Sequence, residues 1–127
     1  MKQATAIIAN TKDFRAVCKQ PDLYKNTHCE IMNCELFLNP EQGRLRFSIT
    51  GNRFLRGMVR CWVYFLLEVG TNKMTLDDMQ KIINLEKTSP DKQPAYPNGL
   101  FLSKVEYPFI QFKDTHQLIR MMKVGLE

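Results

Sequence analysis

The sequence predicts an α+β domain in which helices pack on one face of an antiparallel sheet. Residues 27–38 and 44–50 have the patterns of two strands, and turn-forming residues between them predict a hairpin. Three other segments, 11–18, 52–70 and 75–83, carry apolar residues at helical spacing. Helices and strands are mixed along the chain and the neighbouring strands are antiparallel, which together indicate this class.

The composition is that of one globular domain spanning residues 1–127. Of the 127 residues, 44% are hydrophobic and 24% are charged, which allows a core and is unlike a disordered tail. The net charge of +5 favours an acidic partner such as nucleic acid, although many basic proteins bind nothing anionic.

No segment predicts a membrane span or an export signal. The apolar run Cys61–Leu67 is too short to cross a bilayer, and Ala4–Ala9 is too short for the apolar region of a signal peptide. We therefore expect a cytoplasmic location and no membrane partner, with the four cysteines as reduced thiols.

The first half of the chain predicts a short helix followed by the hairpin. Thr11 can cap the helix, and a proline ends it near residue 21. The segment 39–43 between the strands contains the proline and glycine of a tight turn. The apolar stripe of the helix is Phe14, Val17 and Cys18, and the apolar face of the second strand is Leu45, Phe47 and Ile49.

The second half predicts two helices, a strand and a terminal helix. A long helix runs from Asn52 to Gly70, and Thr75 caps the next helix. Three prolines exclude long regular structure in residues 86–98. Apolar residues then predict a strand over 99–107, and a short helix over 114–124.

Three arginines, Arg53, Arg56 and Arg60, mark the candidate site. In a continuous helix they would share a face only about 60° wide. Arg53 and Arg56 could equally lie on a solvated stripe. Arg60 stands directly before a long apolar run, so a guanidinium withdrawn from water there requires a carboxylate or a phosphate. Other basic residues could add attraction to phosphates: Lys25, Arg44, Arg46, Lys73, Lys92 and Lys104.

The cysteines and histidines do not predict a metal site. On a strand, Cys29 and Cys34 would point to opposite faces, no Cys-x-x-Cys occurs, and the two histidines are far apart. Neither a serine-nucleophile motif nor a phosphate-binding glycine loop is present in the sequence.

Three separated motifs resemble the tRNA pseudouridine synthase A family. Residues 54–60 (Phe-Leu-Arg-Gly-Met-Val-Arg), with the apolar helix that ends at Gly70, resemble its signature. Residues 94–108, with their Gly-Leu pair, resemble its closing motif, and residues 13–35 resemble the entry to its C-terminal half. The resemblance covers about residues 11–108, and the order of the motifs makes it specific.

The resemblance implies an isomerase that converts uridine to pseudouridine in the anticodon arm of tRNA. The family needs no metal or organic cofactor and works as a homodimer, with tRNA held in basic clefts between the subunits. Its fold has two related halves that share one antiparallel sheet. An arginine of the C-terminal half pairs with the catalytic aspartate, and the matching position here is Arg60. Leu100 matches the leucine of the Gly-Leu pair and is a candidate for the uridine pocket, while Arg53 and Arg56 are candidates for RNA phosphates.

The family's catalytic aspartate lies in an Arg-Thr-Asp-x-Gly loop of the N-terminal half, and this motif does not occur in the chain. We therefore expect the chain to be half of a pseudouridine synthase fold, inactive without the N-terminal half of the same enzyme. The alternative is a non-catalytic RNA-binding or assembly module with the same fold.

Overall fold

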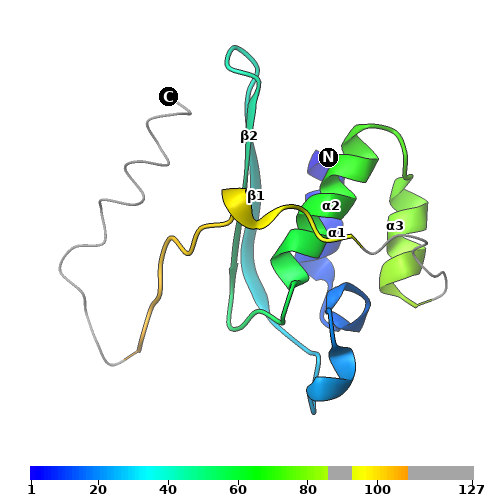
Figure 1. Cartoon of the computed structure of the whole chain (residues 1–127), viewed down its shortest axis with the longest axis vertical. Helices are drawn as coiled ribbons and strands as arrows, with labels where there is room; N and C mark the ends of the chain where they lie inside the picture. The colour runs from blue at the N-terminus through cyan, green and yellow to red at the C-terminus, as the bar shows by residue number, and fades with distance from the viewer. Residues whose placement is uncertain (86–92, 109–127) are drawn as a thin grey trace.

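The computed structural model of the chain describes residues 1–85 and 93–108 (Figure 1). These residues form three α-helices and a two-stranded antiparallel sheet, so the predicted α+β class is confirmed. The elements in chain order are α1 (Lys2–Asn10), β1 (Ile31–Asn39), β2 (Arg44–Gly51), α2 (Met58–Gly70) and α3 (Leu76–Ile83). Short 3₁₀ turns lie at Arg15–Val17, Pro21–Leu23 and Pro97–Gly99.

The predicted hairpin is formed by β1 and β2, whose register places Phe37 opposite Arg46. The turn between the strands depends on Gly43, whose φ of +59° is readily adopted only by a residue without a Cβ. β1 begins at Ile31, later than predicted, because the preceding chain makes only an isolated bridge at His28.

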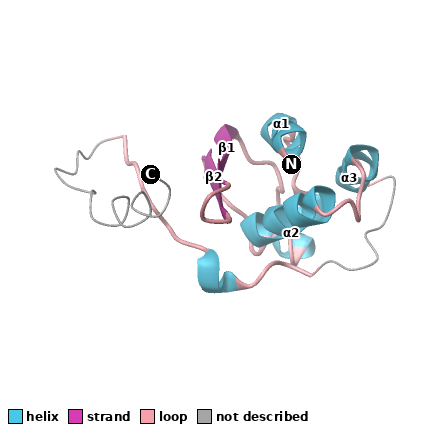
Figure 2. Cartoon of the chain, turned by 90° about the horizontal axis from the view of Figure 1, so that it is seen from above, coloured by secondary structure: helices cyan, strands magenta, loops and turns pink. Residues whose placement is uncertain are grey.

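All three α-helices lie on one side of the hairpin, with α3 farthest from the strands, as Figure 2 shows from above. The core is centred on Trp62 of α2, which is fully buried. Its ring contacts Phe14 and Phe65 edge-on, with centroid separations of 5.9 and 6.0 Å. The prediction of helices packed on one face is therefore confirmed.

Helix α1 is a feature that the sequence prediction missed. Ala4 and Ile8, one turn apart, are both completely buried, so the helix belongs to the core. The signal in the sequence is weak because the helix buries only this pair and has no side-chain cap.

The helix predicted over residues 11–18 is wrong, because only Arg15–Val17 forms a single 3₁₀ turn. The N–H of Phe14 donates to the carbonyl of Thr27 at 3.0 Å, which ties this backbone to a distant segment rather than to a helix. The predicted apolar residues are nevertheless buried, since Phe14 and Val17 are at most 1% exposed.

Helix α2 begins later than predicted because Gly57, with a φ of +74°, forms its left-handed N-cap. The loop before it is tied to the approach of β1: the N–H of Asn52 donates to the Glu30 carbonyl, and the N–H of Glu30 donates to the Asn52 side chain. Arg53 and Arg56 therefore precede the helix, and the prediction that they share a helical face with Arg60 is wrong.

Helix α3 has the predicted cap, since the hydroxyl of Thr75 accepts the N–H of Asp78 at 3.0 Å. The strand predicted over 99–107 is not formed: after the turn at Pro97–Gly99, residues 100–106 belong to no strand. The predicted helix over 114–124 lies outside the described residues. In the parts of the chain that are described, no helix has the length and apolar character needed to cross a membrane.

Candidate nucleic-acid site

The first turn of α2 holds Arg60 in a fixed orientation. Its Nε donates to the carbonyl of Ala95 at 2.6 Å, and the N–H of Ala95 donates to the Arg60 carbonyl at 3.0 Å. The side chain is half-buried, and its two terminal nitrogens hydrogen-bond to no residue within the described ranges. The guanidinium is thus anchored through Nε and keeps its outer edge for an anion.

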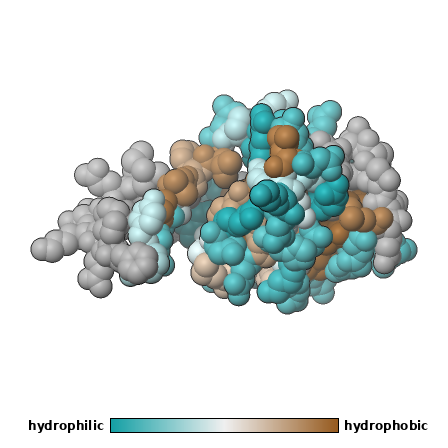
Figure 3. All heavy atoms as spheres, turned by 90° about the horizontal axis from the view of Figure 1, so that it is seen from below, coloured by the Kyte–Doolittle hydropathy of each residue, from teal (hydrophilic) through white to brown (hydrophobic). Residues whose placement is uncertain are grey.

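A cavity of about 550 Å³ lies between β2, the first turns of α2 and residues 95–104. Arg60 and Leu100 both line this cavity, so the structure brings these two predicted site residues together. Figure 3 shows apolar atoms gathered where the chain leaves the body of the molecule toward its C-terminus. The apolar and aromatic lining residues are Leu45, Phe47, Ile49, Val59, Val63, Ala95, Tyr96, Leu100 and Phe101.

The charged groups of the cavity are all cations: Arg46, Arg60 and Lys104. Lys104 is paired with Glu106, whereas Arg46 makes a cation–π contact with Phe37, with its guanidinium carbon 4.3 Å from the ring centroid. Among the described residues that line the cavity there is no carboxylate, imidazole or thiol. These walls suit a planar ring with an attached anion, and among the described lining residues they contain no aspartate that could attack the ring.

Arg53 and Arg56 lie outside the cavity and are exposed. Arg53 donates to the carbonyl of Asn26 at 3.0 Å and lies 5.7 Å from the ring centroid of Tyr24. Arg56 donates to the side chain of Gln20 at 2.9 Å, and its N–H donates to the Tyr24 hydroxyl. The structure therefore separates these two arginines from Arg60 and places them together on a second surface.

Sequence reasoning did not single out Arg46 as a residue of the cavity. The alternation in β2 places it on the face opposite Phe47, together with Arg44, but does not distinguish between these two arginines. Only the position of residues 95–104 beside β2 shows that Arg46 faces the cavity, and a contact between segments so far apart in sequence leaves no local pattern.

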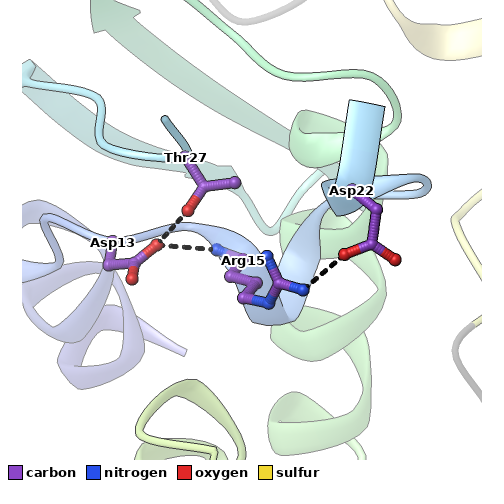
Figure 4. Close-up of polar contacts among 4 residues, drawn as sticks. All are labelled: Asp13, Arg15, Asp22 and Thr27. Carbon is purple, nitrogen blue, oxygen red and sulfur yellow. Dashed lines mark hydrogen bonds and ion pairs between the residues drawn. The ribbon is translucent and has the colours of Figure 1, made fainter. Parts of the chain in front are cut away.

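Asp13 belongs to a local polar group, drawn in Figure 4, and not to the cavity. The hydroxyl of Thr27 donates to its carboxylate at 2.5 Å, and the N–H of Arg15 donates at 3.1 Å. The hydrogen bond from Thr27 is the main cause that lowers the pKa of Asp13, against an opposing effect of burial. Arg15 also pairs with Asp22 at 2.6 Å. A carboxylate held ionised in this way is a structural acceptor.

The two aspartates of α3 are also used locally. Asp77 pairs with Lys81 at 2.9 Å, and Asp78 completes the cap of the helix.

Burial raises the pKa of the Cys29 thiol, and raises that of Cys34 to about 11, so both are protonated at neutral pH. Within residues 1–85 and 93–108, no three histidine, cysteine or acidic side chains lie close enough to hold a metal ion.

Comparison of the sequence with known proteins identifies a family that the chain matches. Residues 11–108 match the family model described as tRNA pseudouridine synthase, a range that contains Arg53, Arg56, Arg60 and Leu100. No solved structure matches the chain.

Several curated relatives carry the name tRNA pseudouridine synthase A. The chain is 34% identical to one from Azobacteroides pseudotrichonymphae over 90% of its length, and 37% identical to one from Bacteroides fragilis over 85%. The matched segments are only 45% and 42% of those relatives, so the chain spans less than half of their length. Because this family model matches most of the sequence, the chain belongs to the tRNA pseudouridine synthase family.

Proposed function

We propose that the chain is the C-terminal domain of a tRNA pseudouridine synthase that converts uridine to pseudouridine in the anticodon arm. In this proposal an N-terminal half supplies the catalytic aspartate, and Arg60 pairs with it. The observation that carries the proposal is the anchored guanidinium of Arg60, whose outer edge is without a partner among the described residues, in a cavity lined by no carboxylate.

The pairing has a chemical role. A carboxylate entering an apolar cavity tends to take up a proton, which would remove its nucleophilic form. The outer nitrogens of Arg60 would keep it ionised and oriented through charge-assisted hydrogen bonds, while the bond from Nε to Ala95 keeps the guanidinium from turning away.

The apolar wall of the cavity is suited to bind the uridine base. A uridine must leave its stack to reach a catalytic group, and a flipped base is held by close apolar and aromatic contacts. Leu100 lies on the same cavity as Arg60 and is proposed to form part of that wall. Arg53 and Arg56, exposed outside the cavity, are proposed to contact phosphates of the surrounding RNA. The proposed partners are tRNA, the N-terminal half, and a second copy in a homodimer.

The test is release of tritium from tRNA labelled at C5 of uridine. We expect no release by the 127-residue chain alone and turnover when the chain is produced together with the N-terminal half. Replacing Arg60 by Lys in that assembly should lower the rate by about 100-fold, because one ammonium group cannot both bond Ala95 and pair with a carboxylate. Arg44→Lys, on the exposed part of β2, is the matched control and should have no effect.

Release by the chain alone would show that it contains its own nucleophile and would refute the proposal. A second candidate function is a non-catalytic RNA-binding or assembly module, which the absence of a carboxylate among the described lining residues also favours. That module would bind tRNA without turnover even beside the N-terminal half, and Arg60→Ala would then weaken tRNA binding.

A further inference from the structure

Arg46 is a second arginine of the cavity whose hydrogen-bonding groups lack protein partners. It extends from β2, lines the cavity with Arg60, and makes neither a hydrogen bond nor an ion pair with any residue within the described ranges. Its Nε is buried and unpaired. A donor left without an acceptor is costly in a folded protein and calls for an explanation such as a bound anion, which would reach the terminal nitrogens of this half-buried side chain.

The orientation of Arg46 is set by the hairpin. Phe37 lies directly opposite in the ladder, and the guanidinium carbon lies over its ring, 4.3 Å from the centroid. This cation–π contact holds the guanidinium in place, and it supplies no oxygen acceptor for the N–H donors of the group. Glu35 lies two positions from Phe37 on the same strand face, yet it forms no ion pair with Arg46 within 4.0 Å.

The remaining charges indicate which ligand fits. Lys104 is already neutralised by Glu106, and Arg60 is assigned to a carboxylate in the proposed function. Arg46 is therefore the cation left for an anion carried by the ligand itself. The aromatic rings of Phe47, Tyr96 and Phe101 border the same space and suit a base.

We propose that Arg46 binds the phosphate of the nucleotide whose base enters the cavity, with uridine 5′-monophosphate as the smallest ligand of this class. The choice of uridine rests on the proposed function. The phosphate contact rests on Arg46 itself and adds a substrate-binding residue to Arg60 and Leu100.

The experiment compares uridine 5′-monophosphate with uridine as ligands of the 127-residue chain, by titration followed in ¹H–¹⁵N NMR spectra. We expect the monophosphate to bind about tenfold more tightly than the nucleoside, as one charge-assisted contact allows. In Arg46→Gln the two ligands should bind equally, with uridine affinity unchanged. Arg46→Lys should keep part of the difference, because the charge remains and the planar stack is lost.

Arg44→Gln is the matched control, since Arg44 lies on the same strand face and carries the same charge but does not line the cavity. It should keep the full preference for the monophosphate. Equal binding of both ligands by the unaltered chain, no binding of either, or an equal loss in Arg44→Gln would each overturn the inference. The binding and turnover experiments can also give different answers. If the chain prefers the monophosphate but shows no turnover when produced with the N-terminal half, Arg46 is supported as a phosphate contact and only the proposed function is refuted.

Discussion

The hydrogen bond between Arg60 and Ala95 decides which part of this side chain is available for chemistry. An arginine has five N–H donors, and the contact at 2.6 Å uses the one on Nε. What remains is the outer edge of the guanidinium, the edge that pairs with two oxygens of a carboxylate or phosphate. The contact therefore selects a geometry for the anion as well as its sign.

Asp13 offers a prediction for pH dependence. Its pKa is lowered from the ordinary value of 3.8 chiefly by the hydrogen bond from Thr27. A lowered pKa means that the bond stabilises the fold above pH 3.8, and that this contribution disappears as the pH falls through the lower folded value. Thr27→Val should move the NMR titration midpoint of the Asp13 carboxylate up toward 3.8.

The control for this prediction is Thr5→Val, which alters a hydroxyl that donates to the Lys2 carbonyl and has no contact with Asp13. The midpoint of Asp13 should then stay where it is. An unchanged midpoint in Thr27→Val would mean that another group holds the carboxylate ionised.

At this scale the sequence predicts residue types better than residue partners. The position of Arg60 before an apolar run correctly indicates a half-buried cation, because the run must be buried and the arginine is attached to it. Its contact with Ala95 could not be predicted, since it joins residues 35 positions apart. The same holds for Arg46, whose role depends on chain segments that only folding brings together.

Among the elements, the junction between β2 and α2 depends on a glycine with a positive φ. Gly57 caps α2 with a φ of +74°, a conformation that costs a residue with a side chain about 1–2 kcal/mol. A Cβ there would also lie 3.4 Å from the Cβ of Lys19. Gly57→Ala should therefore lower the free energy of unfolding by about 1–2 kcal/mol, measured by urea denaturation.

Gly99→Ala is the matched control. Gly99 has no positive φ, and a Cβ added there would meet nothing within 4 Å. Its free energy of unfolding should change by less than about 0.5 kcal/mol. A cost at Gly57 no larger than this would show that the cap is not a conformational constraint.

The elements that the sequence predicts well are those with complete local signals. The hairpin has alternation and a Pro–Gly turn, and α3 has both an apolar stripe and a Thr–Asp cap. The early start predicted for α2 fails because the apolar pattern continues into the loop, where Leu55 is buried without being helical. The strand predicted over 99–107 fails for another reason. An alternating segment forms a strand only when its backbone pairs with the edge of a sheet, and residues 100–106 belong to no strand.

For the whole molecule, exposed apolar surface is the main consequence of this architecture. Leu100, Phe101 and Leu102 are 50%, 56% and 73% exposed, beside a two-stranded sheet. Such surface, with unpaired strand edges, favours association with another chain. We expect the 127-residue chain to self-associate, seen as a sedimentation coefficient that rises with concentration.

Replacing Phe101 and Leu102 by Ser should weaken this association. Leu23→Ser is the control, because Leu23 is equally exposed but lies in the turn Pro21–Leu23, outside the segment 95–104. A strictly monomeric chain at high concentration would contradict the prediction.

The Arg60–Ala95 contact also has a consequence for how the chain can vary in length. In polymer terms it closes a loop of 35 positions that contains most of α2 and all of α3. The entropy of closing a loop grows only with the logarithm of its length, at about 0.6 kcal/mol for a doubling. A few residues added to this loop should therefore cost only a small fraction of this amount in closure entropy.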